Sequence, residues 1–348
     1  MARNGIYHLL RALGFHAGQT VLVPDYHHGV EVQAIQAAGA SIRYYAVNRH
    51  LEPDLDEVAR LCRSNPRALY VTHFLGWPQP IDELAALCRE RGIMLIEDCA
   101  LALLSQAGQR PLGTFGHYAV FCLYKTLPVP NGGLLVQHAK VPEELMPLAL
   151  RSCSLASVGG RSLDLALEWV RGRSDRLGKI LGLPKKALAQ LLNALGVERQ
   201  PAGTAAFDLA HVNLRMSSLC HGLVKRFDYE QIRRTRRANF LRLQERLAGR
   251  VTVPRQELGE GVCPLLFPLL VPDKPSAARA LRQRGIGALE WWSHAPAIKT
   301  GASSDSQLLR DHLLGLPIHQ DVTPSQVEYM ADQVLRLELR LEPLRARR

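Results

Sequence analysis

The sequence of 348 residues has no apolar run that approaches the ~20 residues a membrane-spanning helix needs. Its first residues, Met1 to Gly5, lack the charged and then apolar layout of a secretory signal. The seven cysteines are scattered, odd in number and without a C-x-x-C pair, which argues against a disulfide scaffold or a metal site. We therefore expect a cytoplasmic protein without a membrane anchor or a bound metal.

Signatures of nucleic-acid binding are also missing, although the net charge of +11 would suit such a partner. No helix-turn-helix, zinc-finger or RNP pattern accompanies the charge. The basic residues are spread over stretches with helical spacing and over the tail, at 233–237, 279–284 and 345–348. We interpret them as solvated helix faces, or as the source of a field that attracts an anionic substrate, and expect no nucleic-acid partner.

What is present is a regular alternation of strand and helix patterns in a composition of ordinary globular type, 47% hydrophobic and 22% charged. Short apolar runs at 20–24, 41–47, 68–72 and 93–100 alternate with helical spacing at 30–38, 55–62 and 81–91. This order predicts an α/β fold with a mostly parallel sheet covered by helices on both faces.

An acid and an amine stand at the ends of two neighbouring predicted strands. The run Ile93 to Ala100 carries Asp98 near its end, and Phe121 to Lys125 ends in the lysine. Ligands of open α/β sheets bind outside the carboxyl ends of the strands. A lysine there can form a Schiff base with the aldehyde of pyridoxal phosphate (PLP), and a carboxylate can keep its pyridine nitrogen protonated. The pair therefore predicts a PLP site.

The same residues carry a family resemblance. Leu95-Ile96-Glu97-Asp98, Gly113-Thr114-Phe115-Gly116, and Lys125 before Asn131-Gly132-Gly133 resemble the DegT/DnrJ/EryC1/StrS aminotransferases. The resemblance implies a PLP-dependent transferase of fold type I, in a family many of whose members aminate keto sugars carried on nucleotides. It implies that Lys125 is the catalytic Schiff-base lysine and that Asp98 is the partner of the pyridine nitrogen.

Further cofactor contacts follow from the resemblance alone. The turn that opens the first helix would hold the phosphate, and His28 would stack on the ring, unless it is a plain loop histidine. Asn213 would reach the phosphate of a neighbouring subunit, which implies a homodimer with a shared active site, unless this segment is a plain helix cap. The cofactor-binding residues implied in this way are Arg3, Asn4, His28, Asp98, Ala100, Cys122, Lys125 and Asn213. Leu101 and Leu103 stand near where the family has a glutamine and a histidine.

The chain is predicted to divide into a large PLP-binding α/β domain at 1–208, a long linking helix region at 209–250 and a small α+β domain at 251–348. The linking region is expected to carry a long basic helix at 218–248, and the last helix is expected to start near Thr323-Pro324, with Thr323 as its N-cap. Within the first part, 146–208 is expected to form a helical insertion or lid, with helices at 163–170 and 187–195. Several aromatic residues near predicted strand ends could reach the pocket or pack in the core: His73, Trp77, Trp291, Trp292, His294 and His319.

The predicted reaction is a transamination. An amino donor, by resemblance glutamate, would give its nitrogen to a keto acceptor, by resemblance a keto sugar on a nucleotide. An alternative is a catalytically weakened PLP-binding member with a regulatory or assembly role. A sugar dehydratase is disfavoured, because known dehydratase relatives carry histidine in place of the lysine at position 125.

Overall fold

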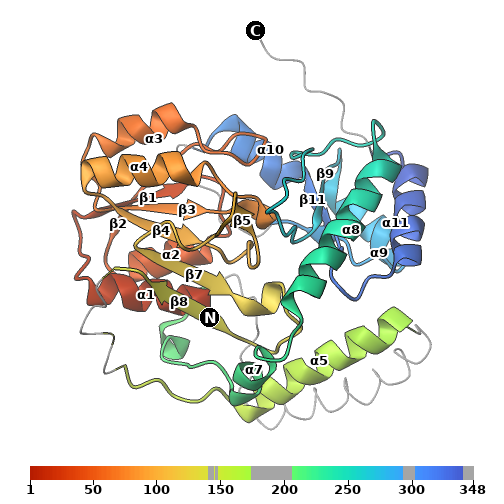
Figure 1. Cartoon of the computed structure of the whole chain (residues 1–348), viewed down its shortest axis with the longest axis horizontal. Coiled ribbons are helices and arrows are strands. Elements are labelled where there is room, and N and C mark those ends of the chain that lie inside the picture. The colour runs from red at the N-terminus through yellow and green to blue at the C-terminus, as the bar shows by residue number, and fades with distance from the viewer. Residues whose placement is uncertain (140–144, 146–147, 174–205, 293–301, 340–348) are drawn as a thin grey trace.

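The computed structural model describes residues 1–139, 145, 148–173, 206–292 and 302–339, and a six-stranded sheet lies at its centre (Figure 1). The strands follow the order β2 (Ser41–Tyr45), β1 (Thr20–Pro24), β3 (Ala68–Thr72), β4 (Met94–Asp98), β7 (Tyr118–Cys122) and β8 (Gly133–Gln137). The first five run parallel, and β8 pairs antiparallel with β7. The predicted mostly parallel α/β sheet is confirmed.

Helices cover both faces of this sheet (Figure 1). Helices α1 (Ala2–Ala12) and α2 (Val30–Ala37) pack on one face, and α3 (Leu55–Cys62) and α4 (Ile81–Arg91) on the other. The helix α4 ends at Gly92, which takes the left-handed conformation (φ 65°) that glycine adopts most readily. Because side chains alternate along a strand, Leu69 and Val71 of β3 pack on the α3–α4 side and Tyr70 points to the α1–α2 side.

The lysine at position 125 lies beyond its strand rather than within it. The strand β7 ends at Cys122, and Leu123–Lys125 form the short 3-10 helix η2. The expected strand is cut short because the backbone N–H of Leu123 bonds Gly132 O and that of Thr126 turns back to Leu123 O. The chain then returns as β8, which the sequence did not predict.

A second, antiparallel sheet lies in the C-terminal part in the order β10 (Leu289–Glu290), β11 (Leu313–Leu316) and β9 (Phe267–Leu270). The helices that flank it are α8 (Tyr229–Leu247), α9 (Lys274–Gln283), α10 (Ser304–His312) and α11 (Pro324–Arg336). The predicted start of the last helix is confirmed: Thr323 caps α11, Pro324 is its first residue, and Thr323 and Gln326 form a capping box.

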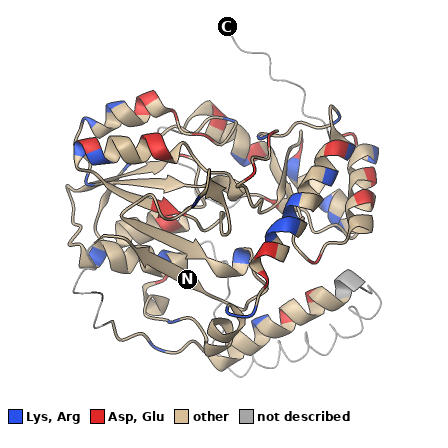
Figure 2. Cartoon of the chain, viewed as in Figure 1, with Lys and Arg blue, Asp and Glu red and all other residues tan. Residues whose placement is uncertain are grey.

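The long basic helix expected over 218–248 is broken into two. The structure shows α7 (Ser218–Leu223) and then α8, whose start is capped by the Asp228 side chain accepting from Gln231 N–H. Arginines gather along α8 (Figure 2). Some of them are used within the fold, since Arg237 donates to the carbonyls of Gly259 and Val262, and Arg246 pairs with Asp332.

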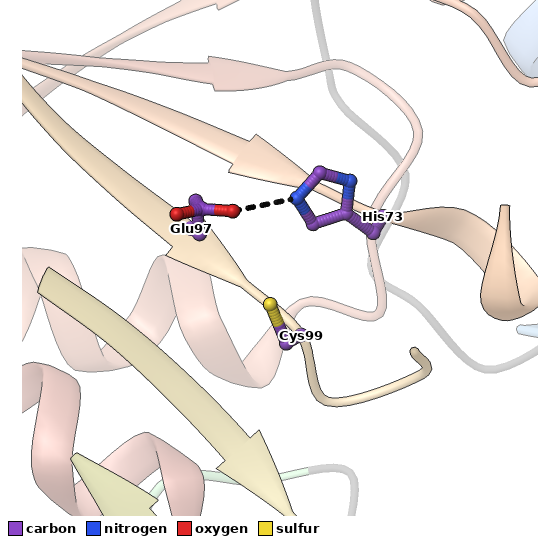
Figure 3. A group of neighbouring side chains, drawn as sticks. All are labelled: His73, Glu97 and Cys99. Carbon is purple, nitrogen blue, oxygen red and sulfur yellow. Dashed lines mark hydrogen bonds and ion pairs between the residues drawn. The ribbon is translucent and has the colours of Figure 1, made fainter. Parts of the chain in front are cut away.

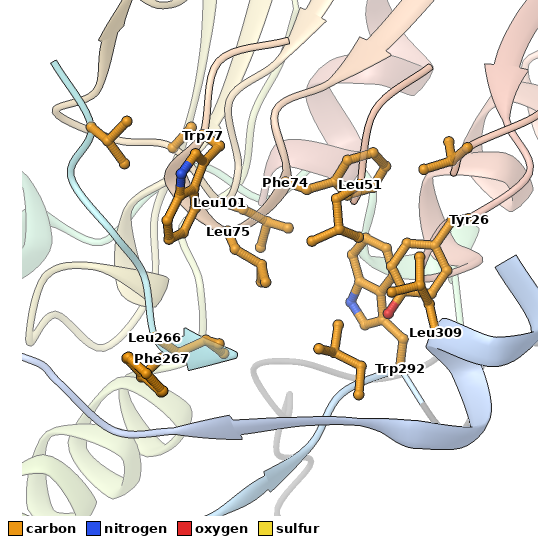
Figure 4. Close-up of a cluster of buried hydrophobic side chains, with 14 of the residues drawn as sticks. Tyr26, Leu51, Phe74, Leu75, Trp77, Leu101, Leu266, Phe267, Trp292 and Leu309 are labelled. Carbon is orange, nitrogen blue, oxygen red and sulfur yellow. The ribbon is translucent and has the colours of Figure 1, made fainter. Parts of the chain in front are cut away.

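The two sheets share one hydrophobic core. Leu69 and Leu95 of the large sheet and Leu269 and Leu314 of the small one belong to the same buried cluster. Figure 4 shows part of it, with side chains from both regions. Trp77 is a core residue, 3% exposed, with its ring edge-on to Phe240 at 5.4 Å. Because one core joins the two sheets, it also fixes how the edges of the two sheets face each other.

The region 146–208 is described only in part. Helix α5 (Leu155–Arg173) includes the helix expected at 163–170, whereas the one expected at 187–195 lies outside the described residues, as does His294. Among the described residues, none of the helices combines the length and the apolar character needed to cross a membrane.

Candidate active site

A cavity of about 640 Å³ opens at the carboxyl ends of β1, β3, β4 and β7. Open α/β sheets bind ligands at this edge, outside the carboxyl ends of their parallel strands. Six of the predicted cofactor-binding residues line it: Arg3, His28, Asp98, Ala100, Cys122 and Lys125. They come from segments up to 122 residues apart in the chain, from Arg3 to Lys125, which the sheet order brings together.

Asp98 ends β4 and lies deep in the cavity, 7% exposed. Its Oδ1 accepts a hydrogen bond from Ala100 N–H at 2.9 Å. Burial raises the pKa of this carboxyl, and the positive charge of Lys125 works against that rise. The carboxylate and the ammonium therefore face one space, as the sequence predicted for two neighbouring strands.

Lys125 is half-buried at the cavity wall, and no hydrogen bond or ion pair ties its amine to another of the described residues. Its backbone is held firmly, because Leu123 and Leu127 on either side are buried. The next residue is anchored as well, since Thr126 O accepts from the buried Arg236 of α8 at 3.0 Å. A positioned backbone with a chemically available amine suits a nucleophile.

One wall of the cavity is aromatic. His28, which follows β1, stands edge-on to Trp292 with ring centroids 6.2 Å apart. Tyr26 packs against the same tryptophan at 4.8 Å. Of the aromatic residues that the sequence offered as rim candidates, Trp292 lines the cavity, and Trp291 and His319 do not. The neighbouring His27 is buried away from the cavity against Tyr44.

The opposite end of the cavity meets the start of α1. The first turn of a helix presents backbone N–H groups and a partial positive charge, which favours an anion. Arg3 lines the cavity there and donates to Ala206 O at 2.9 Å. Asn4 is turned the other way, because its amide donates to the carbonyls of His211 and Val212 at 3.0 Å.

Asn4 belongs instead to an adjoining hollow, lined also by Asn131 and Arg215. Asn213 is exposed and lines neither hollow, although its carbonyl accepts from Arg151 N–H at 2.7 Å. Within one chain the structure thus does not bring Asn4 or Asn213 to the cavity that holds Lys125.

Glu97, the neighbour of Asp98, points to the other face of the sheet. Figure 3 shows its carboxylate bonded to His73. Its oxygens accept from four donors: the N–H groups of Gly113 (2.8 Å), Phe115 (2.7 Å) and Gly116 (2.6 Å), and His73 Nε2 (3.2 Å). Burial alone would raise the pKa of Glu97, but the bonds from His73, Gly116 and Gly113 outweigh it and lower the pKa. This carboxylate is fully committed to holding the 113–116 loop.

His73 serves the same network, so the expectation that it reaches the cavity rim is wrong. Its Nδ1 accepts from Gln79 N–H at 3.1 Å, which leaves the proton on Nε2 for Glu97. His73 and Glu97 are both 0% exposed. Cys99 lies close to them (Figure 3), and the three could face a metal ion, but the Glu97 oxygens already accept from four protein donors.

Two glycines of the loop explain why it can approach Glu97. A side chain at Gly113, where φ is 86°, would collide with the Phe121 ring. One at Gly116 would come within 2.8 Å of Leu95 O. The Gly-x-x-Gly spacing therefore has a structural cause at this site.

Four polar side chains of the cavity were not predicted from the sequence: Glu31, Tyr70, Thr72 and Tyr124. Tyr70 and Thr72 alternate along β3 beside Asp98, since Thr72 pairs with Asp98 across the sheet. The sequence did carry a signal for them: Tyr70 and Thr72 are two residues apart at the end of a strand, so they point to the same face of the sheet. Glu31 follows His28 by three residues at the start of α2, where an acidic residue is ordinarily read only as a helix cap.

The residues present fit PLP. A carboxylate, an amine, a stacking imidazole and a helix start surround one cavity, which matches the ring nitrogen, aldehyde, ring face and phosphate of that molecule. The hydroxyl of Thr72 is buried at this cavity without a hydrogen-bond partner among the described residues. A buried polar group of this kind requires an explanation, and a polar ligand supplies one.

Residues 2–162 match the model of the DegT/DnrJ/EryC1/StrS aminotransferase family. A dTDP-4-dehydro-2,3,6-trideoxy-D-glucose 4-aminotransferase of Saccharopolyspora spinosa is 35% identical over 153 residues, which are 43% of this chain and 38% of that protein. A GDP-perosamine synthase of Vibrio cholerae is 30% identical over 135 residues, 38% of this chain and 37% of that protein. The matched segments thus span well under half of these relatives.

The fold extends the similarity over almost the whole chain. The crystal structure of the aminotransferase TlmJ from Streptoalloteichus hindustanus superposes with a TM-score of 0.66 at 22% identity, covering 96% of this chain and 83% of that one. The predicted fold, that of the PLP-dependent transferases of type I, is thereby confirmed for the chain beyond residue 162.

Proposed function

Residues 2–162 of this chain belong to the DegT/DnrJ/EryC1/StrS aminotransferase family, and from this premise we propose that the protein is a PLP-dependent aminotransferase. The resemblance carried by 95–98, 113–116 and 125–133 falls inside the matched segment. Members of this family depend on PLP, and the cavity residues fit that cofactor.

The observation that supports the proposal most is the meeting of Asp98 and Lys125 in one buried cavity at adjacent parallel strands. Either residue alone would be unremarkable, since strand-end carboxylates commonly cap turns. Together they supply a fixed negative charge and a nucleophilic amine to the same small molecule.

The chain's own residues would divide the work as follows. When bound, PLP supplies an electron sink for the pair released as the donor's Cα–H bond breaks. Lys125 would hold the aldehyde as a Schiff base and, once released, carry a proton to and from the donor's α-carbon. Asp98 would keep a proton on the ring nitrogen. His28 would cover the ring, and Arg3 with the start of α1 would hold the phosphate.

The substrates proposed are an amino acid donor, glutamate, and a keto sugar carried on a nucleotide. The names of the relatives support this acceptor, because each name refers to a sugar carried on a nucleoside diphosphate. The net charge of +11 would favour the approach of such an anion.

A homodimer with a shared active site completes the proposal. Asn213 is exposed and lines neither of the two hollows described above. An exposed amide on the surface near α7 is free to enter the site of a second copy, where it would contact the cofactor phosphate.

The experiment is spectroscopic. Purified protein with PLP is expected to show a visible band that disappears on adding glutamate and returns on adding a nucleotide-linked keto sugar from a panel of such compounds. A protein that takes up no PLP would contradict the proposal. No response to glutamate or any other amino donor would contradict aminotransferase activity.

One observation favours a second candidate, a PLP-binding member with weakened catalysis. Leu101 lines the cavity and is 2% exposed, where the family has an amide that reaches the cofactor's ring hydroxyl. A visible band indifferent to every amino donor would support this candidate.

A further inference from the structure

Glu31 places a second carboxyl in the cavity of Asp98 and Lys125. It stands in the first turn of α2, is 7% exposed and lines the cavity. Its Oε1 accepts a hydrogen bond from His28 N–H at 2.8 Å. This bond fixes the carboxyl beside the residue expected to cover the cofactor ring, so Glu31 is held in place rather than free on the surface.

The electrostatic neighbours of Glu31 come from five elements. They are Tyr44 of β2, Tyr70 of β3, Asp98 of β4, Lys125 of η2 and Arg310 of α10. Burial raises the pKa of both tyrosines, which keeps them neutral. Burial, and then the charge of Asp98, raises the pKa of Glu31 itself, whereas the Lys125 charge lowers it. An additional cation in the cavity would therefore favour the ionised form of Glu31.

The charged groups of the cavity can be matched to parts of the cofactor. Arg3 lines the cavity at the start of α1, where the phosphate is expected, whereas Asp98 and Glu31 are the two carboxyls that share the cavity with the amine of Lys125. Asp98 is expected to hold the ring nitrogen of PLP. Glu31 is then the carboxyl that remains for the nitrogen of the Lys125 linkage.

Resting on the proposed function, we propose that Glu31 is the counter-ion of the nitrogen that joins Lys125 to the cofactor. Its carboxylate stabilises the protonated form of that nitrogen, the form that the amine of a donor attacks. Asp98 and Glu31 thus hold one proton each at two different nitrogens of the same ligand.

Arg310 is the competing partner for Glu31. It is 8% exposed, its Nη2 donates to Asp25 O at 3.0 Å, and its guanidinium lies over the Tyr26 ring at 5.6 Å. No hydrogen bond between Glu31 and Arg310 is seen, whereas Glu31 shares the cavity with Lys125 and Arg310 does not line it. This geometry favours Lys125.

The test is a pH titration of the visible band of the PLP-loaded protein, which reports protonation of the linkage without requiring turnover. Glu31→Gln keeps an oxygen that can accept from His28 N–H but removes the charge. We expect the midpoint of the titration to fall by about 1 pH unit, tenfold in proton affinity, as for loss of a nearby opposite charge. Glu31→Asp keeps the charge, so its titration midpoint should lie close to that of the wild type.

Glu57→Gln is the matched control, because Glu57 also lies in the first turn of a helix and accepts a backbone N–H, that of Ala46 at 2.7 Å. The titration midpoint of Glu57→Gln should equal that of the wild type. A Glu31→Gln midpoint equal to the wild type, in a protein with a normal band, overturns this inference alone. A wild-type protein without any visible band overturns the proposed function and this inference with it.

Discussion

At the scale of residues, Glu97 and Asp98 show how one strand end serves two purposes. Consecutive residues of a strand point to opposite faces. Asp98 therefore enters the cavity, whereas Glu97 is 0% exposed on the other side and collects four donors. The sequence pointed to Asp98 through its position at a strand end. The partners of Glu97 were not predictable, because the N–H groups that it binds belong to a loop 16 to 19 residues away.

Replacing Glu97 tests this second role. Glu97→Gln puts an amide group against backbone N–H donors, so at least one buried donor loses its acceptor. We expect a loss of about 3 kcal/mol in the free energy of unfolding, measured with urea at neutral pH. Glu90→Gln on the surface of α4 is the control and should change stability by less than about 0.5 kcal/mol. Equal stability of the two variants would contradict the role assigned to Glu97.

The stability that Glu97 supplies should also depend on pH. Its pKa in the folded protein is below the ordinary value of 4.5, so the unfolded chain binds the proton more readily. This contribution is therefore complete above pH 4.5 and is lost as the pH falls through the lower, folded value. Urea unfolding of wild type and Glu97→Gln between pH 7 and pH 3 should show the gap between them narrowing in acid. A gap that widened in acid would contradict the sign.

At the scale of elements, α8 connects the turn that carries the lysine to the second sheet. The buried Arg236 donates to Thr126 O (3.0 Å), to Leu265 O (2.9 Å) and to Gln320 Oε1 (3.2 Å). A charged group is buried here with several acceptors that compensate for lost water. The turn that carries Lys125 is thus held by a bond from Arg236 to Thr126, two residues 110 positions apart in the chain.

Arg236→Met would remove the guanidinium donor from Thr126 O, Leu265 O and Gln320 Oε1. We expect a loss of about 2–4 kcal/mol in the free energy of unfolding, together with weaker PLP binding measured by titration of the visible band. Arg234→Met is the control, because Arg234 is exposed on the same helix. If Arg236→Met bound PLP as tightly as the control, the link from α8 to the lysine turn would be refuted.

The elements that the sequence predicted well are those set by local patterns. The apolar runs became β1, β3 and β4, and Thr323-Pro324 began α11. The errors lie where contacts between residues distant in the sequence determine the local structure. The 3-10 turn at Lys125 depends on a bond to Gly132 O, and β8 exists because it pairs with β7. The break between α7 and α8 was signalled by Asp228, an N-cap inside an otherwise helical pattern.

At the scale of the whole molecule, the candidate site gathers residues from Arg3 to Trp292. The sequence predicted the core of the site, Asp98 and Lys125, because each stands at a recognisable strand end. It did not predict that Glu31 and Thr72 join them, since the sheet order β1-β3-β4-β7 is needed to bring those segments together. Asn213 remains a prediction that concerns the assembly of two chains, whereas Asn4, expected at the phosphate of its own chain, lies in the adjoining hollow.

The shared site can be tested by mixing two inactive variants. Lys125→Ala lacks the lysine and Asn213→Ala lacks the amide, so a mixed dimer would contain one site with both groups intact. We expect about a quarter of wild-type activity after the two are unfolded and refolded together, because half of randomly formed dimers would be mixed and each would carry one working site. No recovery on mixing would mean that Asn213 serves its own chain or no site at all.

The most direct measurement concerns Lys125. The protein loaded with PLP is treated with borohydride, which fixes a Schiff base permanently, and the modified peptide is identified by mass spectrometry. We predict a single pyridoxyl label on Lys125, and we expect this label to be lost in Lys125→Ala. The Asp98→Asn variant should keep the lysine but take up PLP more weakly. A label on another lysine, or a label retained at the same level in Lys125→Ala, would contradict the proposed site.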